Sequence, residues 1–71
     1  MTHVDCALVI LAHNGSPFTR HCLESILGAA VLPAELFLVD NASSDETPAL
    51  IAEMAPRLRA AGVAVTTWRN E

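Results

Sequence analysis

Hydrophobic residues along the chain fall into two kinds of pattern that alternate. Residues 7–11 are continuously apolar, which is typical of a parallel strand covered on both faces. Residues 36–39 form a second apolar run, and residues 63–68 form a third that is mostly apolar. Clusters of turn-forming residues follow the first two runs, at residues 13–17 and 40–48. We therefore predict three strands.

Between the strands, apolar residues recur at spacings of three and four, which indicates helices with one apolar face. We expect the first helix to begin at Ser16 as N-cap, with Pro17 next. Its apolar face comprises Phe18, Cys22, Leu23, Ile26 and Leu27. We expect the second to begin at Thr47 as N-cap. Its apolar face comprises Leu50, Ile51, Met54, Ala55 and Leu58. Pro56 lies inside this second helix, where it should kink or break the helix.

The order of elements is therefore β-α-β-α-β, which defines an α/β fold in a single small domain of 71 residues. Two right-handed crossovers place three parallel strands side by side, with the helices able to cover one face. Ligands of such sheets bind beyond the carboxyl ends of the strands. Topology alone thus nominates residues 11–14, residues 40–45 and the segment after Trp68.

Composition excludes several other classes of protein. Hydrophobic residues make up 52% of the chain, which argues against disorder, and charged residues only 17%. The formal net charge of −4 argues against binding to nucleic acid, which requires a basic patch. Residues 6–12 are too short an apolar run to span a bilayer. Cys6 and Cys22 fit neither a disulfide framework nor a zinc site, and we expect both to be reduced core residues in a cytoplasmic protein.

Three polar residues are candidates for chemistry. Asp40 ends the second apolar strand, where its carboxylate could accept hydrogen bonds from a ligand or could instead satisfy the backbone of a turn. His13, at the matching end of the first strand, could be a base, a stacking platform or a loop residue. Asp45 is more typical of a helix start than of a catalyst. Trp68 could stack on a nucleobase or close the edge of the sheet.

Two segments together resemble a known family. The first comprises residues 8–14 (LVILAHN) and residues 22–27 (CLESIL). It is similar to the opening of family 2 glycosyltransferases, whose first strand commonly ends Pro-Thr-Tyr-Asn and whose helix carries a Cys-Leu-x-Ser-Leu run. Residues 35–47 (ELFLVDNASSDET) closely match the family's Val-Asp-Asn-x-Ser-x-Asp-x-Thr signature at the expected spacing. The resemblance covers nearly the whole chain.

The resemblance implies a GT-A (Rossmann-like) fold, with residues 1–71 forming the N-terminal part of the nucleotide-sugar-binding domain. Leu11, Ala12 and His13 would line the nucleoside pocket, and Asp40 would accept a hydrogen bond from the base at the open end of its strand. The loop from Asn41 to Asp45 would form the rim of the pocket. The donor would be a UDP-sugar or another nucleoside-diphosphate sugar, transferred with inversion to an acceptor hydroxyl.

The resemblance also implies what these residues lack. Family members bind Mg²⁺ or Mn²⁺ through an Asp-x-Asp motif on a later strand, and this sequence contains no Asp-x-Asp. The acceptor-binding half, with its general base, is missing too. We therefore expect the segment alone to bind no cofactor and to be inactive, within a full-length protein that is an enzyme at the cytoplasm or the cytoplasmic face of a membrane.

In the family's sheet the first strand is internal, with the third strand on one side and later strands on the other. A chain of this length would leave one edge of the first strand bare, so we expect the isolated segment to self-associate through Ala7 to Leu11 or to be ordered only in a larger assembly. Two other interpretations stay open. One is a complete, non-catalytic nucleotide- or partner-binding module, and the other is a flavodoxin-like domain without its later strands. An Asp-x-Asp motif after Glu71 in the parent gene would favour the glycosyltransferase.

Overall fold

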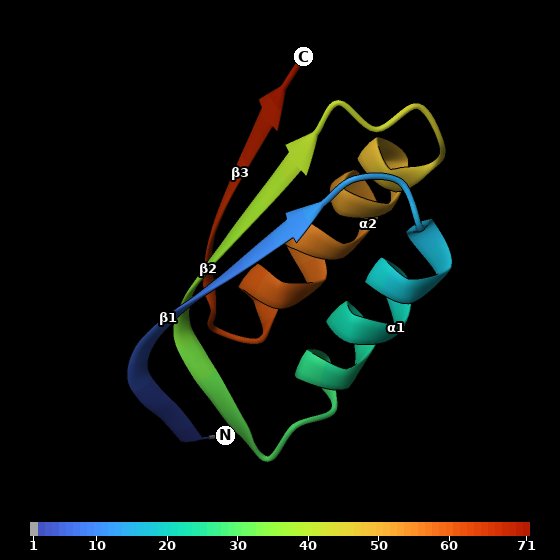
Figure 1. Ribbon diagram of the computed structural model, residues 1–71. Coiled ribbons are helices and arrows are strands. Elements are labelled where there is room, and N and C mark those ends of the chain that lie inside the picture. Colours follow the sequence, from blue (N-terminus) through green and yellow to red (C-terminus); the bar gives the residue numbers. More distant parts are fainter. Residues whose placement is uncertain (1) are drawn as a thin grey trace.

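The computed structural model describes residues 2–71, in which strands and helices alternate along the chain (Figure 1). The strands are β1 (Thr2–Ala12), β2 (Val31–Asn41) and β3 (Ala64–Asn70), and the helices are α1 (Ser16–Leu27) and α2 (Thr47–Ala60). The predicted β-α-β-α-β order, with its three-stranded parallel sheet, is confirmed.

The sheet has the order β1-β2-β3, with every pair of neighbours parallel. The arrangement that we carried over from the family, with the third strand beside the first, is therefore wrong. β2 lies beside β1, and β3 lies on the far side of β2. Both connections cross over in the same direction, so each strand lies beside its predecessor. Ala12, Asp40 and Arg69 are successive register partners across the sheet.

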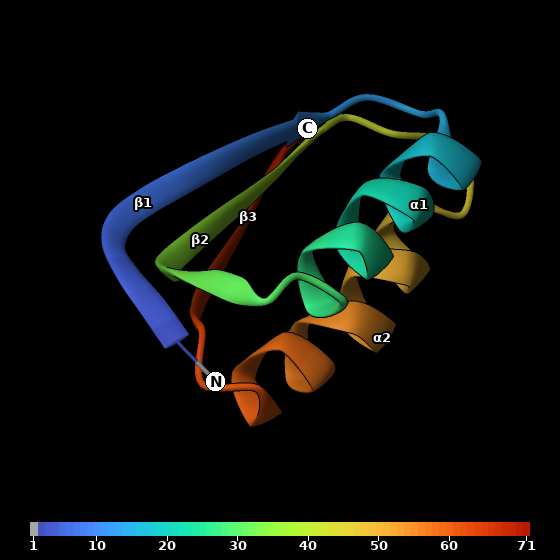
Figure 2. The ribbon, with the colours of Figure 1, turned by 90° about the horizontal axis from the view of Figure 1, so that it is seen from below.

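Both helices pack on one face of the sheet, as Figure 2 shows. Every second side chain of β2 points toward them, and Leu32, Leu36 and Leu38 are at most 1% exposed. The five apolar residues predicted for α2 are all buried, which confirms its apolar face. The opposite face of the sheet is bare: Leu11 is 68% exposed and Trp68 is 64% exposed.

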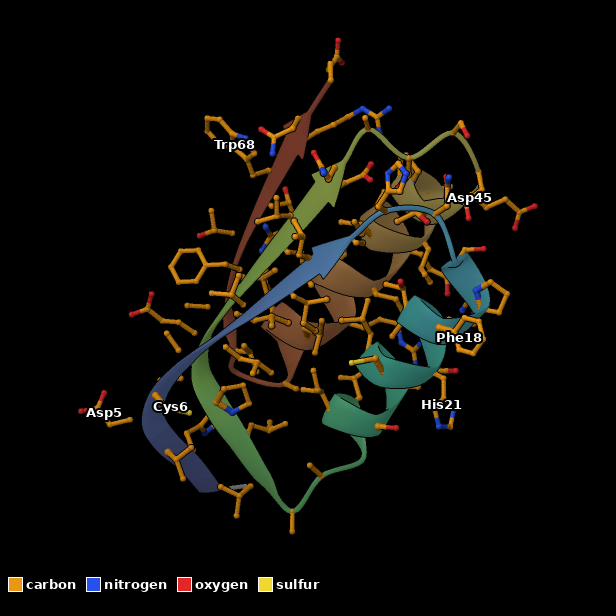
Figure 3. All side chains as sticks on the ribbon, in the orientation of Figure 1. Asp5, Cys6, Phe18, His21, Asp45 and Trp68 are labelled. Carbon is orange, nitrogen blue, oxygen red and sulfur yellow. The ribbon has the colours of Figure 1, made fainter. Side chains whose placement is uncertain are left out.

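The apolar face predicted for α1 is only partly buried. Leu23 is fully buried, but Phe18 is 84% exposed and projects away from the sheet (Figure 3). Cys22 and Cys6 are exposed free thiols, so their prediction as core residues is wrong. Among the described residues, α2 is the only other helix, and no element packs against the side of α1 that faces away from the sheet. Periodicity marks an apolar stripe but does not say how much of that stripe a neighbour covers.

Two expectations about α2 need correction. The helix continues through Pro56 to Ala60, so the proline does not break it. A proline removes one backbone donor, and the buried side chains of Met54 and Leu58 hold the helix against the sheet on either side. Thr47 is the first helical residue rather than the N-cap, and Ser16 has the same position in α1. Within residues 2–71, no helix has the length and apolar character needed to cross a membrane.

Candidate functional site

The loops that follow β1 and β2 lie side by side at the carboxyl end of the sheet (Figure 1). His13 Nδ1 is 2.5 Å from the carbonyl oxygen of Asn41. The backbone N–H of Asn14 donates to Ser43 Oγ at 2.7 Å. Topology nominated these two loops, and the structure places His13 beside Asn41 there.

Asp40 lies at this end of β2 and beside the end of β1, as predicted, but its carboxylate is turned inward instead of being accessible to a ligand. The residue is only 3% exposed. Asp40 follows Leu36 and Leu38 at every second position of β2, so its side chain falls on the same face, which the helices cover. Oδ1 accepts a hydrogen bond from Ser43 N at 3.2 Å, and Oδ2 pairs with the Arg69 guanidinium. The carboxylate is therefore near the end of β1 but covered.

Arg69 is the residue that covers Asp40, and it was not singled out from the sequence. It lies opposite Asp40 in the register of β3, and its Nη2 donates to the carbonyl oxygen of Ser43 at 3.1 Å. The Arg69 side chain is 41% exposed, against 4% for that of Asp40. Topology had nominated the segment after Trp68, but the ion pair depends on a register that no local pattern reveals.

Asp45 lies where the two helices begin (Figure 3). Its Oδ2 accepts a hydrogen bond from Ser16 N at 3.1 Å, at the start of α1. Its Oδ1 accepts from Thr47 N at 2.9 Å and from Thr47 Oγ1 at 2.6 Å, at the start of α2. The hydrogen bonds from Thr47 hold the pKa of Asp45 below its ordinary value. The prediction of a helix-start residue is confirmed, and one carboxylate serves both helices.

Asn14 connects the same loops from the other side. Its Oδ1 accepts hydrogen bonds from Ser44 N at 2.8 Å and from Asp45 N at 3.3 Å. Sequence reasoning missed this role, because the bonded residues lie 30 and 31 positions away.

Leu11 and Ala12, the other predicted pocket residues, do not share a face. Leu11 is 68% exposed on the bare face, whereas Ala12 is 5% exposed and lies beside Asp40. Successive strand residues point to opposite faces, so only one of these two side chains can line a given pocket.

A cleft of about 320 Å³ runs between α2 and β3, with Asp40 and Arg69 at one end. Ile51 and Ala55 form part of its apolar wall, and Trp68 on the edge strand β3 is another of its lining residues.

The side chains of the described residues do not fit the divalent cation that the resemblance implies. Within residues 2–71, no three His, Cys, Asp or Glu side chains are grouped as metal ligands.

A three-stranded parallel sheet, with both helices on one face and interlocked polar loops at its carboxyl end, is the architecture of the first part of a Rossmann-like binding domain. The chain matches the model of glycosyl transferase family 2 over residues 7–70, nearly its whole length, and it belongs to that family. Comparison with curated proteins and with solved structures gave no match. Family membership confirms the resemblance found in the sequence and indicates glycosyl transfer as the general activity.

Proposed function

We propose that this chain is the N-terminal, donor-binding part of a glycosyltransferase that transfers a sugar from a nucleoside-diphosphate donor to an acceptor hydroxyl with inversion. The observation that carries the proposal is the Asp40 carboxylate. It lies at the carboxyl end of the middle strand, next to the end of β1, under a single half-exposed arginine. The chain belongs to family 2, and the resemblance assigns the carboxylate at this position to the nucleobase.

Donor binding requires Arg69 to release part of the carboxylate. A carboxylate has about four lone-pair positions, and the bond from Ser43 N occupies one of them. Because the Arg69 side chain is 41% exposed, it can turn toward solvent without being buried unpaired. An N–H group of the base then donates to Asp40 Oδ2. His13, which is exposed beside Asn41, lies at the rim of the same site and can stack on the nucleoside.

The proposed site is a site for the nucleoside rather than for the diphosphate. Arg20 and Arg69, the cations nearest the two loops, are both paired with carboxylates. The N–H groups of Ser16 and Thr47, which could hold phosphate at helix N-termini, are bound to Asp45. We therefore propose that metal binding and catalysis belong to other parts of the full-length protein, and that this segment alone is inactive.

A second candidate is a non-catalytic nucleotide- or partner-binding module. No set of metal ligands is grouped within residues 2–71, as both candidates expect, so sugar transfer by the full-length protein decides between them. Release of UDP from a UDP-sugar by the full-length protein in the presence of Mg²⁺ or Mn²⁺ would exclude this second candidate. Nucleotide binding without any sugar release, across a panel of donors and acceptors, would favour it.

Calorimetric titration of the full-length protein with UDP, and then with GDP, ADP and CDP, tests the proposed site. Asp40→Ala should weaken binding by about 1.5–3 kcal/mol, the range for hydrogen bonds to charged groups. Asp40→Asn should also weaken it, because this variant keeps an acceptor for Ser43 N but presents a donor to the base. Glu35→Ala is the control, since Glu35 is an exposed carboxylate on the same strand, five residues before Asp40. Unchanged affinity in both Asp40 variants would refute the role of this residue.

We further propose that this segment, when it is separated from the rest of the protein, pairs with a second copy through Ala7 to Leu11 of β1. Within the described residues no strand covers the outer edge of β1, and residues 7–11 contain no charged side chain that would oppose pairing. Val9 and Leu11 are 63% and 68% exposed.

The free thiols of Cys6 and Cys22 suit a reducing compartment, and we propose that the protein lies in the cytoplasm or at the cytoplasmic face of a membrane.

A further inference from the structure

The two loops at the carboxyl end of the sheet hold each other through side chains that reach across in both directions. From the first loop, Asn14 Oδ1 accepts the N–H groups of Ser44 and Asp45. From the second loop, the Asp45 carboxylate accepts the N–H of Ser16. We call Asn14, Ser43, Ser44 and Asp45 the loop latch. It is separate from the Asp40–Arg69 pair, although the two meet at Ser43.

The backbone of the first loop directs the Asn14 side chain across the gap. Asn14 has φ of 56° and Gly15 has φ of 68°, so two consecutive residues adopt the left-handed conformation. Glycine and asparagine tolerate this region better than other residues do. The turn presents the Asn14 N–H to Ser43 Oγ at 2.7 Å, and it presents Oδ1 to the next two N–H groups of the second loop. One residue therefore contacts three successive residues of the neighbouring loop.

The latch connects directly to the carboxylate of the proposed donor site. Ser43 is 4% exposed, its N–H donates to Asp40 Oδ1, and its Oγ accepts from Asn14 N. Ser44 and Asp45 follow Ser43 in the chain and are held by Asn14 Oδ1. A displacement of the second loop would therefore move the Ser43 N–H that donates to Asp40 Oδ1, and the carboxylate would move with it.

We propose that Asn14 is a positioning residue for donor binding, which acts through Ser43 and Asp45 to hold Asp40 and the rim of the nucleoside site in their binding geometry. This inference rests on the proposed function. Asn14 itself needs no contact with the nucleotide. Its contribution is to hold the second loop in place before the donor arrives, so that binding does not have to order the loop.

Two substitutions separate the side chain from the backbone. Asn14→Gly keeps the positive φ and the N–H that donates to Ser43 but removes Oδ1. Asn14→Asp keeps an acceptor oxygen and tolerates the same φ. The control is Ser25→Ala, because it removes one side-chain hydrogen bond, from Ser25 Oγ to the carbonyl oxygen of His21, on α1 and outside both loops. Each variant of the full-length protein is titrated with UDP, GDP, ADP and CDP, and its thermal unfolding is recorded.

Asn14→Gly should weaken binding of whichever nucleotide the unmodified protein binds by about tenfold, the effect of one or two lost hydrogen bonds. Asn14→Asp should restore most of the affinity, and Ser25→Ala should leave it unchanged. If Asn14→Gly lowers the melting temperature but binds nucleotide normally, Asn14 is merely structural and the inference is overturned. Failure of the unmodified protein to bind any of the four nucleotides overturns the proposed function as well, so the two failures are distinguishable.

Discussion

The two faces of the sheet differ in how far they expose similar side chains to solvent. On the helix-covered face Leu38 is 1% exposed, whereas Leu11 on the neighbouring strand is 68% exposed on the bare face. The two strand-end residues Asp40 and Trp68 differ in the same way, at 3% and 64%. The polar side chain is the one that is buried, and the large aromatic one is exposed.

This difference in exposure suits the two faces to different ligands, a small molecule on the covered face and another polypeptide on the bare one. The covered face ends in Asp40, whose carboxylate is satisfied by Arg69 and Ser43, and among the described residues no buried side-chain polar atom lacks a partner. A site ordered in this way suits a small polar ligand. The bare face and the edge of β1 present apolar surface and unpaired backbone, which suit another polypeptide.

The largest expected effect comes from truncating the same residue type on each face. Leu38→Ala should lower the free energy of unfolding by about 2–5 kcal/mol, because it leaves a cavity in the core. Leu11→Ala should lower it by less than about 1 kcal/mol, because little buried surface is lost. Chemical denaturation of the two variants measures both values. Equal losses would show that the bare face is covered in solution.

An intermediate effect should come from placing a charge at the edge of β1. The unmodified chain should sediment as a concentration-dependent dimer or larger species. Val9→Lys should shift it toward monomer, since a lysine on an edge strand opposes pairing with another strand. Thr66→Lys is the control, because β3 is the opposite edge strand and Thr66 is exposed. A monodisperse monomer of the unmodified chain that unfolds cooperatively would contradict the proposed self-association.

The smallest expected effect is the pH dependence that Asp45 contributes. The hydrogen bonds from Thr47 lower the pKa of Asp45 in the folded state. Its stabilisation should therefore be fully present above the unfolded-state pKa of about 4 and be lost as the pH falls through the lower folded-state pKa. Asp45→Asn should remove this part of the acid dependence while changing little at pH 2. Thermal unfolding between pH 2 and 7 measures it, and identical pH profiles for the two proteins would exclude the contribution.

Local sequence patterns identified what depends on local chemistry. The order of elements, the five buried residues of α2 and the helix-start role of Asp45 follow from periodicity and from capping preferences. Patterns could not tell that Phe18 and Cys22 lack a neighbour to cover them. Nor could they give the Asp40–Arg69 pair, whose members are 29 residues apart and meet through strand register.

The central claim, that a nucleoside diphosphate binds at the carboxyl end of the covered face, can be tested by hydrogen–deuterium exchange of the full-length protein with and without UDP. Bound UDP should slow exchange in peptides that contain residues 13–16 and 40–47 and should leave exchange unchanged in the carboxyl-terminal half of α1. Unchanged exchange in both loops at a UDP concentration that saturates binding would contradict it.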